Sequence, residues 1–325
     1  MSAQAATSSL NLIAGPQLIG AFFNWALLGV LNIQVYLYHT YFPKDRWPFR
    51  LMVFGILVFE WIHTGLVTSG CMSIYVYGFG NVESLTSLHN SWFAVPVMCA
   101  FVSVFVQIFF AWRIYMFSRS YWLAGGVVTL SLMQGISAIV AGAMMKPLKS
   151  AEDIAHGAIF PAILVWISGA AATDIIIAAL MTVLLLKSRN GLPRTEALIN
   201  RMIELVVETG TLTAGCAVIM LILAKAPQTK NTLLYEALSL TITKVYANTF
   251  LTNLNSRAHM QEGLPKVQVS LSRAEATGFS TTRGTISTGS QPNASYELPS
   301  YSKGYEVNSF NNEVQKSDAD VLAIA

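Results

Sequence analysis

The chain has 325 residues, of which 54% are hydrophobic and 11% are charged, and its mean hydropathy is +0.51. Soluble domains carry about 25% charged residues, so this composition excludes an ordinary soluble protein and indicates a lipid environment. The net charge of +3 is small, and no basic stretch contains interleaved aromatic residues, so we expect no nucleic-acid partner.

The first part of the chain predicts a membrane protein without a cleavable leader. Residues 1–15 are uncharged and lack the basic start of a signal peptide, so we expect them to form a short extracellular tail. Seven apolar runs follow, each near the roughly 20 residues that a spanning helix needs. Strand-like alternation is absent, so we predict an all-α fold, an integral membrane bundle of seven transmembrane helices over residues 16–254. The runs cover 16–38, 51–75, 92–117, 122–144, 159–186, 203–224 and 232–254.

Basic residues in the short loops predict the orientation, because such residues stay on the cytoplasmic side of a membrane. The first, third and fifth predicted loops carry nine Lys and Arg residues, whereas the second, fourth and sixth carry four. We therefore predict that the N-terminus lies outside and the C-terminus inside. The nine are Lys44, Arg46, Arg50, Arg113, Arg119, Lys187, Arg189, Arg194 and Arg201.

Three ionisable residues, Glu60, Asp174 and Lys244, fall near the middle of predicted spans. At about 1.5 Å per residue, each lies roughly 14–18 Å from the end of its helix, near the centre of a hydrocarbon layer about 30 Å thick. An unpaired charge at that depth is costly, so we predict that Lys244 pairs with Asp174 or Glu60 inside the bundle. His63 follows Glu60 by about one turn, and we expect a hydrogen bond between the two.

Two interpretations of this cluster (Glu60, His63, Asp174 and Lys244) stay open. The first is a small-ligand site or proton-linked switch, and the second is a structural latch that fixes the packing of the helices. A di-metal site of the Glu-x-x-His type needs a second copy of the motif, which the sequence lacks, so we expect no metal.

Other chemistries lack their required residues. Lys244 in a seventh helix invites a retinal Schiff base, but the third run has no carboxylate to act as counter-ion, so we expect no cofactor. The five histidines are dispersed and form no hydrolytic motif. We therefore expect that the protein is not an enzyme.

Four charged residues are candidates for the cytoplasmic face: Arg113, Arg201, Glu204 and Glu208. The two glutamates stand near the start of the sixth run, where a helix N-terminus favours negative charge, and we interpret them as interfacial. We expect Arg113 to extend its side chain to the membrane interface, with an ion pair to one of the glutamates as the alternative.

The composition changes after residue 254, where Ser, Thr, Asn and Gly accumulate and apolar periodicity ends. Such a segment cannot bury enough apolar surface to fold alone, so we predict a disordered cytoplasmic Ser/Thr-rich tail over 255–325. The tail is open to phosphorylation. We expect a cytoplasmic protein partner to bind either this tail or the basic loop 187–201.

Short patterns recur in a fixed order from Gly15 to Arg257. They include Gly29-Val30, Phe42-Pro43-Lys44-Asp45, Phe109-Phe110, Arg113-Ile114, Arg189-Asn190-Gly191, Glu208-Thr209-Gly210 and Leu254-Asn255-Ser256-Arg257. The ordered series resembles a basidiomycete family of seven-helix membrane proteins that is catalogued only as a domain of unknown function. The resemblance implies a fungal, multi-pass membrane protein, and it implies no activity.

The sequence thus favours a receptor-like or sensor protein of the plasma membrane or an endomembrane. A small-molecule ligand would meet the buried polar cluster, and the inner loops would report its binding. The alternatives are a proton-linked small-molecule transporter that uses the same carboxylates and a structural membrane protein with no ligand.

Overall fold

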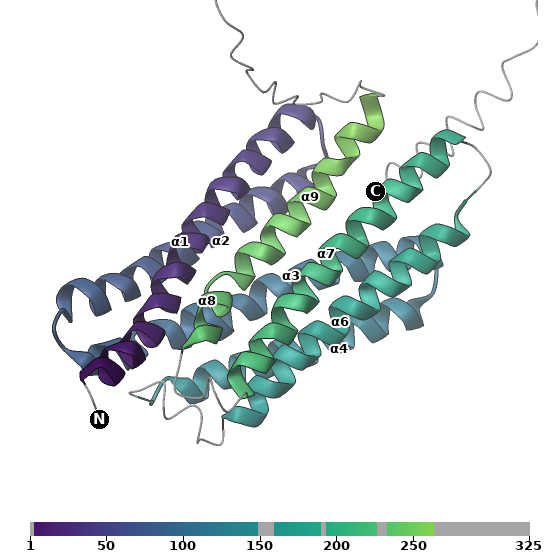
Figure 1. Ribbon diagram of the computed structural model, residues 1–325. Helices are drawn as coiled ribbons and strands as arrows, with labels where there is room; N and C mark the ends of the chain where they lie inside the picture. The colour runs from purple at the N-terminus through teal and green to yellow at the C-terminus, as the bar shows by residue number, and fades with distance from the viewer. Residues whose placement is uncertain (1–2, 149–158, 190–192, 226–232, 263–325) are drawn as a thin grey trace, which may run out of the picture.

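The computed structural model describes residues 3–148, 159–189, 193–225 and 233–262. Over these residues the chain forms a bundle of long α-helices (Figure 1), as the apolar runs predict. A π-helical turn, Ser73–Tyr77, extends α2, a 3-10 turn covers Val82–Thr86, and a second π-helical turn, Phe93–Val97, leads into α3. The helices are α1 (Ala3–Tyr41), α2 (Trp47–Met72), α3 (Met98–Ser118), α4 (Tyr121–Met145), α6 (Phe160–Lys187), α7 (Pro193–Lys225), α8 (Leu234–Ser239) and α9 (Ile242–Glu262).

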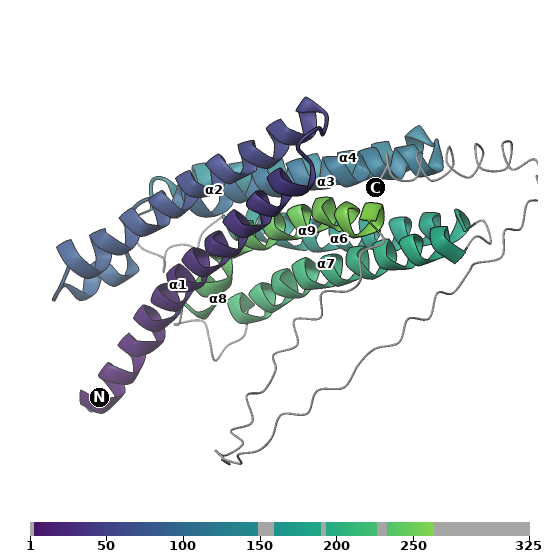
Figure 2. The ribbon, with the colours of Figure 1, turned by 90° about the horizontal axis from the view of Figure 1, so that it is seen from above.

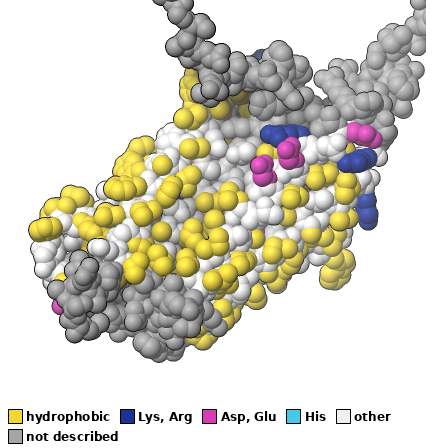
Figure 3. Space-filling model, in the orientation of Figure 1, with side chains coloured by type: hydrophobic (Ala, Val, Ile, Leu, Met, Phe, Trp, Pro, Cys, Tyr) yellow, Lys and Arg dark blue, Asp and Glu magenta, His cyan; other side chains and the backbone are white. Residues whose placement is uncertain are grey.

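Six helical stretches of the described chain are long and apolar enough to cross a membrane. They expose large hydrophobic side chains such as Phe22, Trp61 and Ile136. In Figure 3, hydrophobic side chains are spread over the visible surface, and charged ones gather toward one end of it. A surface of this kind suits lipid and indicates a membrane-embedded protein. The stretches are Asn11–Tyr41, Trp47–Tyr77, Phe93–Ser118, Tyr121–Met145, Phe160–Lys187 and Ile199–Leu223.

The last predicted run, 232–254, is not among these six stretches. Its described part forms two helices, α8 and α9, which are separated by a break at Leu240 and Thr241. α9 lies in the middle of the bundle, in contact with α1, α3 and α7 (Figure 2). Because its neighbours surround it, α9 can carry Thr, Asn and Lys side chains that would be costly on a helix facing lipid.

The helix ends differ from the predicted boundaries. α1 begins at Ala3, inside the predicted tail 1–15, because Ala and Leu in this stretch favour continued helix. α7 begins at Pro193, so part of the predicted loop 187–201 is helical, and α9 continues to Glu262. The predicted disordered tail from residue 263 onward lies outside the described residues.

The bundle has two ends, which we name after one residue at each. The Asp45 end holds the turn between α1 and α2 and the last turns of α9. The Glu236 end holds α8 and the connection between α2 and α3.

Gly20 allows α1 to approach α8 closely. A Cβ atom at this position would lie 2.9 Å from the Cα atom of Ala237, and backbone at that distance cannot rotate away. We expect Gly20→Ala to push the two helices apart and to lower the free energy of unfolding by about 1–3 kcal/mol, measured as thermal unfolding of the detergent-purified protein. Gly29→Ala on the same helix is the matched control, because nothing lies within 4 Å of a Cβ atom there. Equal effects of the two substitutions would contradict the close contact.

Candidate functional site

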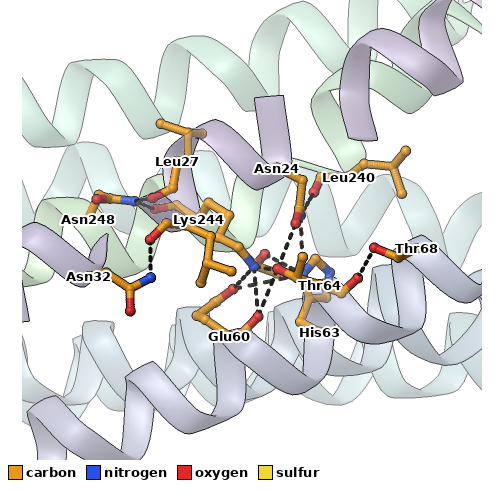
Figure 4. A network of polar contacts seen from close by, with 12 residues as sticks. Asn24, Leu27, Asn32, Glu60, His63, Thr64, Thr68, Leu240, Lys244 and Asn248 are labelled. Carbon is orange, nitrogen blue, oxygen red and sulfur yellow. Dashed lines mark hydrogen bonds and ion pairs between the residues drawn. The ribbon is translucent and has the colours of Figure 1, made fainter. Parts of the chain in front are cut away.

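Lys244 is fully buried and forms an ion pair with the Oε2 atom of Glu60 in α2 (Figure 4). Its Nζ atom also donates to the backbone carbonyl of Glu60 at 3.1 Å and lies 3.1 Å from Nδ1 of His63. An ammonium group has three N–H donors, so these three acceptors satisfy it completely. The second carboxylate oxygen of Glu60, Oε1, has no hydrogen-bond partner among the described residues.

The contacts of His63 define the state of its ring. Lys244 and Asn24 place N–H donors 3.1 and 3.3 Å from its Nδ1 atom, and the hydroxyl of Thr243 lies 3.4 Å from it. Because a nitrogen that faces two N–H donors must accept, the ring is neutral and carries its proton on Nε2. The expected direct hydrogen bond from His63 to Glu60 is absent, since Nδ1 lies 3.8 Å from Oε2 and Lys244 lies between the two residues.

Asn24 of α1 connects this cluster by hydrogen bonds to the break between α8 and α9. Its Nδ2 atom donates to the carbonyl of Leu240 at 2.6 Å, and its Oδ1 atom accepts from the hydroxyl of Thr64 at 2.8 Å. A carbonyl at a helix break lacks its usual intrahelical donor, and Asn24 supplies one. Figure 4 shows these groups converging from three helices. We refer to Asn24, Glu60, His63, Thr64 and Lys244 as the lysine cluster.

Asp174 does not join the lysine cluster. Its Oδ1 atom accepts from Gln107 of α3 at 2.9 Å, and its Oδ2 atom accepts from the hydroxyl of Tyr246 of α9 at 2.7 Å. Of the two predicted partners, Asp174 and Glu60, Lys244 therefore pairs with Glu60. At 3.6 residues per turn, Lys244 and Tyr246 point to nearly opposite sides of α9, which explains how one helix reaches both carboxylates.

Three spaces between the described residues lie near the candidate site or at the Glu236 end. The first adjoins Asp174, between α3, α6, α7 and α9, and measures about 30 Å³. The second lies at the Glu236 end above Leu240, includes Glu236 and His89, and also measures about 30 Å³. Each holds one or two waters and falls far short of the about 300 Å³ of a typical ligand pocket. A third, shallower space of about 240 Å³ lies between His89, Trp92 and Lys146.

The predicted cytoplasmic-face residues are dispersed. Arg113 is 1% exposed and donates to Oδ1 of Asn253 at 3.4 Å, so the expectation that it extends to the interface is wrong, as is its alternative ion pair with a glutamate. The physical reason is that this face of α3 packs against α9. Arg201 instead pairs with Glu204 at 2.7 Å on the exposed surface of α7, and Glu208 is exposed nearby.

α9 forms a second ion pair, which the sequence did not predict. Arg257 donates to Oδ2 of Asp45 at 2.8 Å, and the hydroxyl of Tyr38 donates to the same oxygen at 2.7 Å. The guanidinium lies over the rings of Phe42 and Phe49, 4.6 and 5.2 Å from their centroids. Residue 257 had been assigned to the tail, so the pair was not predicted.

This geometry can hold helices together and can couple them, but it exposes no nucleophile. The lysine cluster is closed, with 0% exposure for Asn24, Glu60, His63 and Lys244. A sealed ion pair of this kind acts as a latch or as a switch between two packings.

Comparison with known proteins adds one match. Residues 170–259 match a family model described as "Family of unknown function (DUF6534)". The matched region contains α8, most of α6 and α9, and all of α7, with Asp174, Lys244 and Arg257. The resemblance to a domain of unknown function is confirmed over these residues. No curated protein and no solved structure matches the chain.

Proposed function

We propose that the protein is a receptor-like sensor with seven membrane spans, an outside N-terminus and a cytoplasmic C-terminus. In this proposal α8 and α9 together form the seventh span. α9 has 21 residues and is therefore about 30 Å long, which matches the hydrocarbon thickness. The Glu236 end would face outward and the Asp45 end would face the cytoplasm, in the plasma membrane or an endomembrane.

One observation carries the proposal: α9 makes an ion pair at each of two levels, one fully buried and one mostly buried. Lys244 pairs with Glu60 at the level of the middle of α2, and Arg257 pairs with Asp45 at the Asp45 end. The two basic residues stand 13 positions apart, or about 20 Å along the helix. A rigid helix that is held at two levels transmits a displacement at one level to the other.

The break at Leu240 is the point where a ligand would act. The small space at the Glu236 end reaches Leu240, whose carbonyl is held by Asn24. A small polar ligand that competes for this carbonyl or for Glu236 would favour a second arrangement of α9. The ligand can shift the equilibrium between the two arrangements of α9 by no more than the difference between its binding free energies for them.

A transporter is the second candidate, because Asp174 adjoins a water-sized space and pairs with no basic side chain in the described part of the chain. It predicts pH-driven flux in proteoliposomes that Asp174→Asn abolishes, whereas a sensor predicts no flux. A structural protein with no ligand predicts neither flux nor coupling between the two ion pairs.

The coupling is testable by cysteine labelling at the Asp45 end. Ser256 is buried beside Arg257 and is replaced by Cys in a protein whose Cys71 and Cys216 are changed to Ala. If α9 couples its two ends, Glu60→Gln should raise the maleimide labelling rate at position 256 about 10-fold, equivalent to about 1.4 kcal/mol. Glu204→Gln, which breaks only the exposed pair, should leave the rate unchanged.

Cys99 provides the internal control, because it is buried in α3 and labels only when the bundle opens. Faster labelling at position 256 with Cys99 still protected supports the sensor. Labelling at position 256 that Glu60→Gln does not change would leave the lysine cluster as a structural latch. A parallel increase at Cys99 would show general unfolding and would count against coupling.

A further inference from the structure

The space beside Asp174 lies between α3, α6, α7 and α9, and both polar and apolar side chains line it. Its volume of about 30 Å³ exceeds the 10–15 Å³ that one water-sized particle needs. Gly210 and Ala178 complete the wall, and a Cβ atom added at Gly210 would come within 2.9 Å of the Cβ atom of Ala178. The polar residues that line the space are Gln107, Asp174, Thr209, Thr213, Tyr246 and Thr249.

In its ionised form, Asp174 brings to this space a negative charge that no basic side chain of the described residues balances. The residue is 6% exposed, and its hydrogen-bond partners Gln107, Tyr246 and Thr213 are neutral. Within the described residues no Lys, Arg or His contacts it, and Lys244 is already paired with Glu60. A buried carboxylate without a cation is costly, so a cation at the adjoining space would stabilise the folded state.

The lining hydroxyl groups offer lone pairs rather than protons. Thr209 donates its proton to the carbonyl of Leu205 at 2.7 Å, and Thr249 donates to the carbonyl of Tyr246 at 3.0 Å. The proton of Thr213 is used as well, because its hydroxyl faces the carbonyls of Thr209 and Gly210 in its own helix and the carboxylate of Asp174. Because these protons are used, the oxygen atoms that remain available can only accept. Such a lining favours a cation over an anion.

The donor set also limits which cation fits. All the groups are oxygens of carboxylate, hydroxyl or amide type, which hard cations prefer, and no thiol or imidazole lines the space. Calcium and magnesium sites usually combine several carboxylates or phosphates, whereas this one has a single negative charge. A monovalent ion balances that charge.

We propose that the space beside Asp174 is a binding site for a small monovalent cation, sodium being the ion of the test. The bound ion would join α6, α7 and α9 through oxygen atoms of Asp174, Thr213 and Tyr246. This site is separate from the lysine cluster and does not depend on the sensor proposal. Failure of one therefore leaves the other intact.

Thermal unfolding of the full-length, detergent-purified protein tests the site. The melting temperature is measured while NaCl replaces choline chloride at constant ionic strength, so that general screening does not change. We expect sodium to raise the melting temperature by at least about 3 °C at saturation. Asp174→Asn should abolish this sodium-dependent rise. An equal melting temperature in sodium and choline, or a rise that persists in Asp174→Asn, would overturn the proposal.

Two threonine variants keep the test decisive if Asp174→Asn does not fold. Thr213→Val removes one lining oxygen at nearly constant volume and should raise the half-maximal sodium concentration about 10-fold. Thr211→Val is the matched control on α7, because its hydroxyl is exposed and also donates to the helix backbone, but it does not line the space. Equal sodium curves for the two valine variants would contradict the site. If low pH stabilises the protein but sodium does not, a proton rather than sodium neutralises Asp174, and the proposal is overturned.

Discussion

Replacing Lys244 with methionine lowers the free energy of unfolding by about 3–5 kcal/mol, and so does Glu60→Gln. Each substitution leaves one member of a fully buried ion pair without its partner. The double variant Lys244→Met/Glu60→Gln should recover most of this loss, because neither charge then remains buried. The measurement is thermal unfolding of the four proteins in one detergent, and the interaction energy follows from the complete cycle.

The exposed pair Arg201–Glu204 is the control for this cycle. Its side chains are 52% and 61% exposed, so its loss should cost less than about 1 kcal/mol. If the single variants Lys244→Met and Glu60→Gln are as stable as the wild type, the buried charges do not stabilise the fold. This result would favour a ligand-responsive role for the lysine cluster. Recovery in the double variant would show that the pair stabilises the packing of α2 against α9, and the labelling rate at position 256 then separates a sensor from a latch.

The second large effect is expected at Asn24. Asn24→Ala leaves the Leu240 carbonyl without its side-chain donor and opens a cavity, whereas the Thr64 hydroxyl keeps the Glu60 carbonyl as an acceptor. An unsatisfied buried group costs about 1–3 kcal/mol and the cavity adds to this cost, so we expect a total loss of about 3 kcal/mol in thermal unfolding. Asn32→Ala is the matched control on the same helix, because Asn32 donates only to Leu28 in its own helix and accepts a weak bond from Trp61 at 3.4 Å.

Comparable losses at Asn24 and Asn32 would contradict the special role of the break. A loss confined to Asn24 would show that the position of α8 relative to α9 depends on one amide group. Hydrogen exchange of the Leu234–Thr241 backbone would then rise in Asn24→Ala, while exchange in α3 would stay low.

The sequence predicted the helical class and the approximate positions of the six apolar stretches because lipid exposure imposes a strong local requirement on composition. It also predicted that Lys244 pairs with a carboxylate, since burial depth follows from position along a helix. It did not choose between Glu60 and Asp174, which lie at similar depth. That choice depends on the direction of each side chain around α9, where Tyr246 faces Asp174.

Features that depend on distant partners escaped prediction. The carbonyl of Leu240 finds its donor 216 positions earlier in the chain, and Arg257 finds Asp45 212 positions away. Arg113 was expected at the interface because an arginine near a helix end usually extends there. Its burial follows from the packing of α3 against α9, which no local pattern encodes.

The burial of α9 has a consequence for how the chain is assembled. A segment with Lys244 and several Asn and Thr residues inserts poorly into lipid on its own, since a central lysine alone costs about 2.5–3.5 kcal/mol during insertion. On the seven-span topology, α9 can enter the membrane only when α1, α2 and α3 already offer Asn24, Glu60 and Arg113 as partners for its polar groups. Its integration is then a late step that requires the earlier helices to be in place. α9 inserts only where those helices are packed correctly, so a misassembled bundle would leave the C-terminal segment outside the membrane.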